Sequence, residues 1–250
     1  MRDDSPPLAS ADTSCPVSVG FGCQVPFAQL AAESRNFAPI DKRELMIAAD
    51  ALGDPGAPMV TDAAFTDTAI EARGDLGDYQ VLHFATHGLT EGQWGCPKSP
   101  PALVTSFGGE QSDGLLSFSE IAQLTLDANL VVLSACDTAS GVRDEALARG
   151  AGQEEAGATL EGLVRAFLAA QARAVLATYW QASAEEDAQQ FIRTFYSTAR
   201  HGTIGGALQS GQRALMTQPR YSHPFFWAPY FVVGDTTKPL LSGPVRIAAR

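Results

Sequence analysis

The sequence has few basic side chains, few cysteines and no long apolar run. Its 17 Lys and Arg residues stand against 28 Asp and Glu residues, so the formal net charge is −11 over 250 residues. A protein that binds duplex nucleic acid needs a basic face to displace counterions from phosphates, and an anionic membrane surface attracts the same kind of face. Neither nucleic acid nor a membrane surface is therefore expected as a partner.

Membrane insertion and secretion are not expected either. The densest apolar stretch, ANLVVLSA at 128–135, has eight residues, whereas crossing a bilayer takes roughly 20. The N-terminal sequence MRDDSPPLASADTS contains one Arg and no apolar segment, unlike a secretory signal. Cys15, Cys23, Cys96 and Cys136 form no CxxC pair and are too few for a disulfide framework, so a reduced, cytoplasmic setting is expected.

The chain alternates apolar runs typical of strands with amphipathic stretches typical of helices. Such alternation indicates βαβ units, and continuous runs such as LVVL and VLHFA fit parallel strands buried on both faces. We therefore predict an α/β fold with a mostly parallel central sheet and helices on both faces. The expected strands are 79–86, 129–135, 173–180 and 225–233, and the expected helices are 42–52, 62–73 (N-cap Asp62), 116–124, 159–172, 184–199 and 204–216.

The remaining segments lack a regular pattern. VSVGFG at 17–22 is a short apolar run that predicts a first strand. We expect one folded domain, 17–235, between two tails. The irregular segments are a flexible N-terminal tail at 1–16, loops at 89–114 and 140–158, and a C-terminal tail at 236–250.

Two residues that suit nucleophilic chemistry stand at predicted strand ends. His87 and Cys136 are 49 positions apart, and two neighbouring parallel strands would bring them to the same edge of the sheet. An imidazole near a thiol lowers the thiol pKa or accepts its proton during attack, and Gly88 allows close approach of backbone N–H groups to an oxyanion. From this pair alone, a small buried thiol and a structural imidazole remain the alternative.

Four motifs in order narrow the choice, and together they resemble the CHAT domain, a caspase-like peptidase domain usually found after tetratricopeptide repeats. The resemblance covers about 17–235 and is strongest from residue 79 onward. The motifs are HFATHG (83–88), LVVLSACDTASG (130–141), LEGLVRAFLAAQARAVLATYW (160–180) and HPFFWAPYFVVGD (223–235).

The resemblance implies a caspase-like three-layer sandwich and a cysteine endopeptidase. His87 would be the base, Cys136 the nucleophile, and the backbone N–H groups of Gly88 and Cys136 the oxyanion donors. No metal or organic cofactor is expected, and the substrate would be a protein or peptide. Relatives carry repeat or sensor modules, and this chain shows no 34-residue self-similarity. We therefore expect regulation either by a separate tetratricopeptide-repeat or sensor partner, or by modules missing from this chain if it is a fragment of a longer protein.

Trp180 and Asp137 are the candidates for the substrate pocket. Trp180 follows the third strand, where related peptidases line the pocket for the substrate residue before the scissile bond (P1); plain core packing is the alternative for this side chain. Ser183 and Ala184 stand where acids are common in the family, which puts a basic P1 preference in doubt. Any such preference is expected to depend on Asp137, since the acidic cluster 185–187 is expected to point to solvent.

Other residues near these motifs are assigned structural roles. His83 and His87 form an HxxxH pattern, but four residues of strand separate the two rings by about 13 Å, too far to share one metal ion, so His83 is taken as structural. Ser134, Asp137 and Thr138 flank Cys136, and for all three the alternative to a role in the site is a turn whose side chains bond local backbone. Three glutamates (Glu154, Glu155 and Glu161) are candidates for the acid that family members carry just before the helix after the nucleophile, and a solvated acidic loop is the more usual alternative.

Two rival functions stay open. One is a catalytically weak or inactive caspase-like interaction module, which the altered segment 181–184 favours and the retained His87 and Cys136 oppose. The other is a non-proteolytic hydrolase or amidase using the same thiol, because a fold does not fix a substrate.

Replacing His87 with Ala should slow alkylation of Cys136. If the imidazole activates the thiol, iodoacetamide should modify Cys136 at about pH 6 to 7, below the ~8.5 at which an ordinary thiol titrates. The His87→Ala variant should react slower by roughly 10² or more, the scale expected for loss of a general base. Peptide-level mass spectrometry measures the rate, and equal rates in both proteins would show that the two residues do not cooperate.

Overall fold

The structure is a computed structural model of the whole chain. The residues described are 40–89, 101–107, 112–134, 154–180 and 185–241, without the side chains of 154–161 and 185, together with the backbone of 16–18, 24–26 and 247–249. The strands are β1 (Pro16–Ser18), β2 (Gln24–Pro26), β3 (Val81–Ala85), β4 (Gly88–Leu89), β5 (Ala102–Val104), β6 (Leu115–Ser117), β7 (Leu130–Ser134), β8 (Ala174–Thr178), β9 (Tyr230–Gly234) and β10 (Ile247–Ala249). The helices are α2 (Arg43–Leu52), α3 (Asp67–Glu71), α4 (Phe118–Gln123), α6 (Glu154–Ala169), α7 (Glu185–Ala199), α8 (Ile204–Met216) and α9 (Pro224–Trp227), with short 3₁₀ turns at Asp62–Ala64 and Leu76–Asp78.

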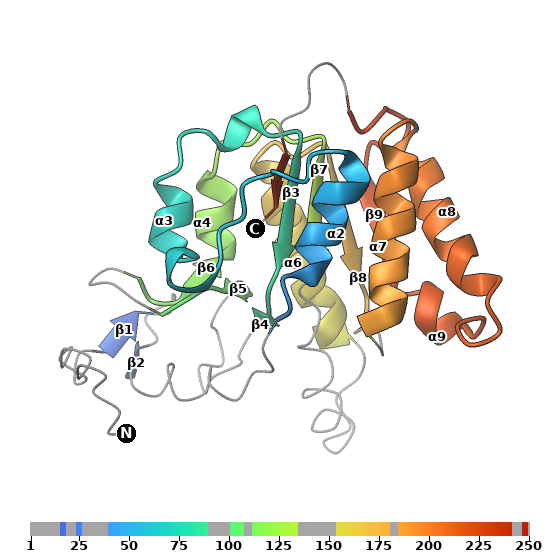
Figure 1. Cartoon of the computed structure of the whole chain (residues 1–250). Helices are drawn as coiled ribbons and strands as arrows, with labels where there is room; N and C mark the ends of the chain where they lie inside the picture. Colours follow the sequence, from blue (N-terminus) through green and yellow to red (C-terminus); the bar gives the residue numbers. More distant parts are fainter. Residues whose placement is uncertain are drawn as a thin grey trace, which may run out of the picture.

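The central sheet has five strands in the order β10-β3-β7-β8-β9. The first four run parallel, and β9 pairs antiparallel with β8 at the edge. In Figure 1, α2 and α7 lie on the near side of the sheet and α6 on the far side. This arrangement confirms the predicted α/β class and its mostly parallel sheet.

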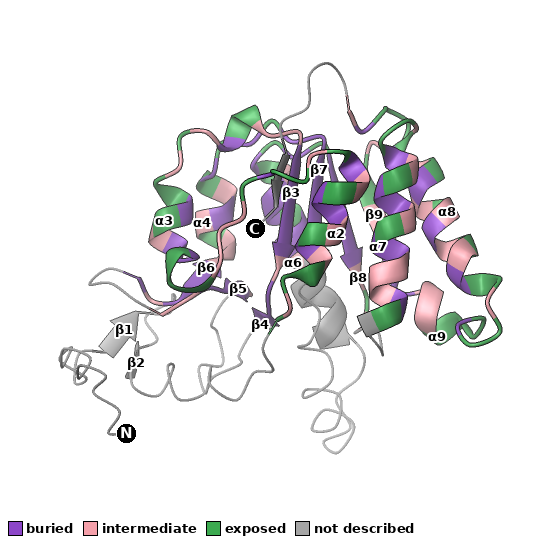
Figure 2. Cartoon of the chain, viewed as in Figure 1, coloured by how far each residue is buried: buried purple, intermediate pink, exposed green. Residues whose placement is uncertain are grey.

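Alternate residues of each strand build two cores, one on each face of the sheet. Leu82 and Phe84 of β3 belong to the core that includes Phe167 of α6. Val81 belongs to the core that includes Phe195 of α7. Because successive side chains of a strand point to opposite faces, buried strands need apolar residues at nearly every position, and Figure 2 shows β3, β7 and β8 buried along most of their length. The result is the expected three-layer sandwich.

Three neighbouring parallel strands end level with one another. Val81 pairs with Leu130 and Ala85 with Ser134, so β3 and β7 stop at paired residues. The β7–β8 register, Val132 with Leu176, carried two residues further places Thr178 opposite Ser134. One edge of the sheet therefore carries the chain segments that follow β3, β7 and β8.

The predicted helix at 62–73 is wrong in extent. Asp62 adopts a left-handed backbone conformation, φ 54°, and begins a 3₁₀ turn rather than capping a helix. The α-helix α3 starts five residues later, where the Thr66 hydroxyl accepts a hydrogen bond from the N–H of Ala69 at 3.1 Å. A threonine cap thus replaces the predicted aspartate cap.

Two further segments fold differently from the prediction. The expected loop 89–114 contributes to a three-stranded antiparallel sheet, β4-β5-β6. Residues 116 and 117 of the helix predicted at 116–124 belong to β6, and the helix begins at Phe118. The apolar run 225–233 is not one strand, because Pro224 at the first helical position and the His223 side chain, which accepts from the N–H of Phe225, begin α9.

Other elements also begin or end at residues that differ from the prediction. Helix α6 begins at Glu154, inside the segment expected as a loop, and only part of that segment lies among the described residues. The first strand predicted at 17–22 is replaced by a β1–β2 hairpin, with residues 19–23 outside the described part. Strand β10 lies within the predicted C-terminal tail and pairs with β3. No helix in the described residues is long and apolar enough to span a bilayer.

Replacing Gly234 with Ala should destabilise the sheet edge. Gly234 has φ 117°, and an added Cβ would lie 2.8 Å from the Cα of Ala174 and against the carbonyl oxygen of Arg173. Strained backbone and this clash should lower the free energy of unfolding by more than about 1 kcal/mol. Chemical denaturation measures the change. Gly74→Ala, where a Cβ meets nothing within 4 Å, is the control and should unfold like the parent.

Candidate functional site

Three residues of interest follow the level strand ends at the same distance. His87 comes two residues after Ala85, and Trp180 comes two residues after Thr178. Cys136 comes two residues after Ser134 in the sequence and lies outside the described residues, as does Asp137. The offset of 49 positions between His87 and Cys136 is therefore the register offset of the two paired strands.

The backbone on both sides of His87 is held by hydrogen bonds. The N–H of Val104 donates to the carbonyl oxygen of His87 at 2.7 Å, and the N–H of Thr86 donates to the carbonyl oxygen of Ser134 at 3.1 Å. The Thr86 hydroxyl donates to the carbonyl oxygen of Val104 at 2.5 Å. His87 is 6% exposed. The residue is thus fixed between the central sheet and the β4–β5 ladder.

This pattern sets the direction of the Gly88 N–H group. In a trans peptide the C=O and the following N–H point in opposite directions. Since the His87 carbonyl points to β5, the Gly88 N–H points away from β5, and Gly88 sits opposite Leu103 as a pair without direct hydrogen bonds between them. The N–H predicted as an oxyanion donor therefore points out of the small sheet.

Asp67 anchors the strands that hold His87. Its buried carboxylate accepts hydrogen bonds from the hydroxyl of Ser112 and, at 3.3 Å, from that of Thr105. The Asp67 N–H donates back to the Thr105 hydroxyl at 3.2 Å. These contacts bind the residue after β5 and the segment before β6 to the start of α3, so helix, small sheet and His87 form one connected unit.

Trp180 lies against α9 at the end of β8. Its indole N–H donates to the carbonyl oxygen of Phe225 at 2.9 Å, and the two rings stack with centroids 6.3 Å apart. The neighbouring Tyr179 is 55% exposed and stacks on Phe231 at 4.1 Å. Trp180 is half-buried rather than part of the core, and this aromatic group borders the edge of the sheet that carries His87.

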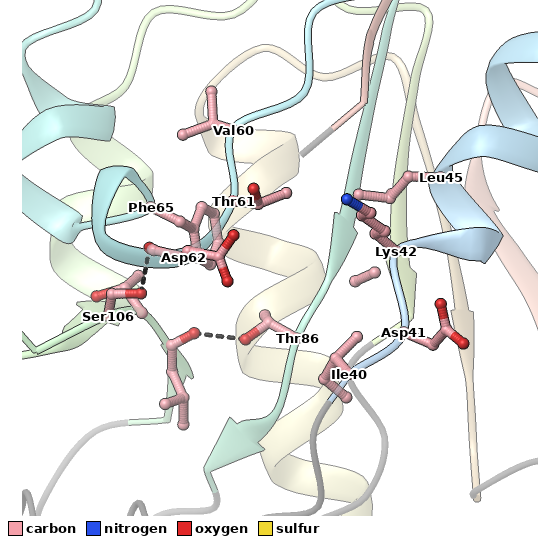
Figure 3. Close-up of a pocket in the computed structure, with 13 residues that line it drawn as sticks. Ile40, Asp41, Lys42, Leu45, Val60, Thr61, Asp62, Phe65, Thr86 and Ser106 are labelled. Carbon is pink, nitrogen blue, oxygen red and sulfur yellow. Dashed lines mark hydrogen bonds between the residues drawn. The ribbon is translucent and has the colours of Figure 1, made fainter. Parts of the chain in front are cut away.

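A cavity of about 480 Å³ opens beside Thr86. Its walls come from the start of α2, the segment around the Asp62 turn, the end of β3 and the end of β5 (Figure 3). The wall is mixed. Its apolar side chains are Ile40, Leu45, Val60, Phe65, Ala85 and Val104, and the remaining lining side chains are polar or charged.

Two charged side chains enter this cavity. In Figure 3 the Asp62 carboxylate and the Lys42 ammonium group point into it from opposite walls. The backbone of Asp62 is held in place because its carbonyl oxygen accepts from the hydroxyl of Ser106 at 2.5 Å. Asp41, also on the wall, is bound to Arg43, and the hydrogen bonds from Arg43 hold the pKa of the Asp41 carboxyl below its usual value. The cavity therefore offers one carboxylate and one ammonium group to a ligand.

A buried polar cluster joins α2, β3, β7 and α7. His83 is 1% exposed; its Nε2 lies 3.1 Å from Oε1 of Glu44, and its Nδ1 lies 3.1 Å from the hydroxyl of Tyr196. The Ser134 hydroxyl donates to the same Oε1 of Glu44. The structural role predicted for His83 agrees with these contacts. Ser134 does not bond the backbone of a turn; its hydroxyl bonds the side chain of Glu44.

Electrostatics in this cluster keep Glu44 ionised. Burial opposes its ionisation, but the hydrogen bond and charge of His83, with the hydrogen bond from Ser134, outweigh burial and hold the pKa of the Glu44 carboxyl below its ordinary value. Burial, with the nearby Glu44 charge, raises the pKa of Tyr196 well above its ordinary value. At neutral pH the cluster therefore contains a carboxylate and a protonated tyrosine hydroxyl.

The acidic cluster predicted to point to solvent does so only in part. Glu186 is exposed, and its carboxylate binds Arg220 at 2.9 Å and the hydroxyl of Tyr221 at 3.1 Å. Asp187 is fully buried, so for this residue the prediction is wrong; the first turn of α7 turns it inward. The side chains of Glu154, Glu155 and Glu161 lie outside the described part. Among the residues described, no group of three or more His, Cys, Asp or Glu side chains is placed to hold a metal ion.

Sequence reasoning missed Glu44, Asp62 and Thr86 as site residues. Glu44 looks like an ordinary acid in the first turn of a helix, where the helix dipole favours it. Asp62 looks like a helix cap, and Thr86 is part of a strand motif. Only the fold shows that these side chains gather near the end of β3.

Comparisons with known proteins agree with this architecture. The CHAT domain family matches residues 8–235. Human tetratricopeptide repeat protein 28 is 26% identical over 271 aligned positions, which cover 94% of this chain and 10% of that protein. The mouse protein of the same name is 30% identical over 128 positions, covering 50% of this chain and 5% of that protein.

The chain belongs to the CHAT domain family, because the family match extends over most of its length. It spans about a tenth of the human relative it matches. The resemblance read from the four sequence motifs is thereby confirmed.

Replacing Asp113 with Asn should stabilise the protein above neutral pH. Burial, with the charges of Asp67, Glu120 and Glu71, raises the pKa of Asp113 to about 7, against a hydrogen bond from the N–H of Leu115. The folded state therefore keeps a proton that the unfolded state loses near pH ~4, so stability falls as pH rises from about 4 to about 7. Asn stays neutral and still accepts from Leu115.

Denaturant unfolding at pH 5 and pH 8 measures this effect. Asp113→Asn should be more stable than the parent by about 1 to 2 kcal/mol at the higher pH, a value reduced for partial exposure, and by a clearly smaller margin at pH 5, where only the first part of the fall between about pH 4 and about pH 7 has occurred. Asp127→Asn, at an exposed aspartate, is the control and should match the parent at both. A gain for Asp113→Asn that is equal at both pH values would contradict the titration.

Proposed function

We propose that this chain is a cysteine endopeptidase that cleaves a protein partner with His87 and Cys136. The observation that carries the proposal is the strand register. Ala85 pairs with Ser134 on adjacent parallel strands, and His87 and Cys136 each follow two residues later. We expect a similar path after the two strands to bring the imidazole and the thiol to the same edge, with ring nitrogen and sulfur within roughly 7 Å, a loose contact of the kind found without substrate.

The proposed reaction is acyl transfer to the thiol. His87 takes the thiol proton, the Cys136 thiolate attacks the scissile carbonyl carbon, and the C–N bond breaks as His87 protonates the leaving amine. Water, activated by His87, then hydrolyses the thioester. The oxyanion formed in both steps would accept hydrogen bonds from the N–H groups of Gly88 and Cys136. The direction of the Gly88 N–H, away from β5, supports this role.

Substrate would lie across the ends of the three strands. Trp180 follows β8 at the same distance at which His87 follows β3, and its ring is held by Phe225. Such a half-exposed aromatic surface suits contact with a peptide side chain. The cavity beside Thr86, with Asp62 and Lys42, offers a second place for a polar substrate side chain.

Regulation by a repeat module is part of the proposal. The human and mouse relatives are tetratricopeptide repeat proteins by name. We propose that a tetratricopeptide-repeat or sensor partner controls this domain, in the same chain or in another.

Peptide-library profiling of the parent and of Cys136→Ala tests the proposed activity. The parent should cleave a subset of peptides, Cys136→Ala should cleave none, and His87→Ala should lose roughly 10² to 10⁴ in rate.

If a basic P1 residue is preferred, Asp137→Asn should remove the preference for Arg over Leu, because a buried cation needs a carboxylate partner.

Two matched variants locate the pocket carboxylate. Glu186→Gln, whose carboxylate already binds Arg220, should keep the parent's preference. Loss of the Arg preference in Asp62→Asn alone would move the P1 pocket to the cavity beside Thr86 and overturn the Asp137 assignment, and better cleavage after Leu by the parent would show an apolar pocket. A parent that binds a partner but cleaves nothing, with Cys136 unreactive, would favour the interaction module.

A further inference from the structure

One carboxylate oxygen links the two strands that lead to the proposed catalytic residues. Oε1 of Glu44 lies 3.1 Å from Nε2 of His83 and accepts the hydroxyl hydrogen of Ser134. His83 lies on β3, four residues before His87 in the sequence, and Ser134 is the last residue of β7, two residues before Cys136. The contact therefore lies directly below the edge of the sheet at which the two catalytic residues are proposed to meet.

The direction of these hydrogen bonds is fixed by chemistry. An ionised carboxylate has no proton to give, so both the imidazole Nε2 and the serine hydroxyl donate to it. Hydrogen bonds to a charged acceptor are about twice as strong as those between neutral groups. The side chain of Glu44 is 19% exposed and that of His83 is 1% exposed, so little solvent competes for the shared oxygen.

Stability alone is a weak reason to bury such a group. Taking a carboxylate out of water costs free energy, and apolar side chains of similar volume often stabilise a core as well or better. The core around the cluster is otherwise apolar and aromatic; Phe195, for example, packs edge-to-face on Tyr196 at 5.3 Å. What the carboxylate adds is a fixed geometry between α2, β3 and β7.

At the ends of β3 and β7, backbone hydrogen bonds hold the two strands together less firmly than in the middle of the strands. The N–H of Thr86 donates to the carbonyl oxygen of Ser134 at 3.1 Å, one residue past the last pair of the β3–β7 ladder. The side chain of Ser134 is bound to Glu44 in the first turn of α2. The end of β7 is therefore tied both to β3, through its backbone, and to α2, through its side chain.

We propose that Glu44 is a positioning residue that acts through Ser134. It fixes the end of β7, from which the chain continues to Cys136, relative to the end of β3, from which it continues to His87. The proposal rests on the proposed function, since it concerns the alignment of the same two residues. Misplacing one reacting group by about 1 Å costs up to roughly 10²-fold in rate, so loss of this link should appear in the chemistry of the thiol.

Alkylation of Cys136 by iodoacetamide in the full chain provides the test. Rates are measured by peptide-level mass spectrometry across about pH 5.5 to 9, with the free energy of unfolding of each variant measured in parallel. Ser134→Ala and Glu44→Gln should each slow alkylation near pH 6.5 by about tenfold or more, the scale of a partial misalignment. Their pH profiles should move toward that of an ordinary thiol, ~8.5.

Tyr196→Phe is the matched control within the cluster. It removes the hydroxyl that bonds Nδ1 of His83 at 3.1 Å, on the far side of the ring from Glu44, and it leaves Ser134 untouched. A general loss of stability would affect this variant too, so it should destabilise the protein yet keep the alkylation rate within about twofold of the parent. Ser134→Thr retains a hydroxyl and a side chain that suits a strand, and it should restore most of the rate.

The outcomes separate the two proposals. If His87→Ala slows alkylation but Ser134→Ala and Ser134→Thr both react like the parent, the positioning role is overturned and the proposed pair stands. Slowing by Tyr196→Phe equal to that of Ser134→Ala also overturns it, because the effect would then follow stability. If His87→Ala leaves the parent's rate unchanged, the proposed pair fails and the positioning role fails with it. Should Glu44→Gln not fold, the two Ser134 variants decide.

Discussion

The parallel pairing of β3 with β7 is the interaction on which the rest of this structure depends. The pairing runs from Val81 with Leu130 to Ala85 with Ser134, and each strand is buried on both faces by side chains of opposite parity. A slip of one residue would turn every apolar side chain to the wrong core and exchange His83 for Leu82 or Phe84 beside Glu44. The same register fixes the numbering offset between His87 and Cys136, so core packing and the proposed chemistry share one constraint.

The small antiparallel sheet fixes the orientation of the peptide group between His87 and Gly88, which the central sheet does not hold. Strand β5 binds the carbonyl of His87 through the N–H of Val104, and the planar peptide that follows turns the Gly88 N–H the other way. Asp67 holds this sheet to α3 through hydroxyl donors. A loop alone would leave the 87–88 peptide free to rotate, whereas paired backbone makes its dipole a fixed feature. Preorganised dipoles of this kind are what stabilise charge that develops during a reaction.

The sequence predicted the parts of the fold whose pattern is local and apolar. Strands β3, β7 and β8 and helices α2, α7 and α8 are close to the predicted ranges, because continuous apolar runs and helical spacing report burial directly. The strands within 89–114 were not predicted because they have only two or three residues and are specified by pairing with each other. The start of α9 depended on one proline, Pro224, and on the His223 side chain, inside a run that otherwise resembles a strand.

The residues of the candidate site likewise fall into those that a local sequence pattern predicts and those that only the fold identifies. His87 and Gly88 were found because they belong to a motif at a strand end, but Asp62 and Glu44 carry no local signal that separates them from a helix cap and a first-turn acid. Their roles come from contacts between segments far apart in sequence: Glu44 meets Ser134 90 positions away, and Asp62 meets Ser106 44 positions away. Long-range contacts of this kind follow from the fold, and the motifs imply the fold without identifying the side chains that meet across it.

The charged cluster at Glu44 shows how stability and geometry are combined in one place. Its contact with His83 lies on the α2 and α7 side of the sheet, while the proposed chemistry lies at the sheet edge above it. Burial alone would drive the Glu44 carboxyl toward its neutral form, yet its pKa is held below the ordinary value by two donors from neighbouring strands. The pKa of the Glu44 carboxyl is therefore held down by two side chains, His83 and Ser134, that β3 and β7 present together. The low pKa of Glu44 therefore depends on the same β3–β7 register on which the proposed alignment of His87 with Cys136 rests.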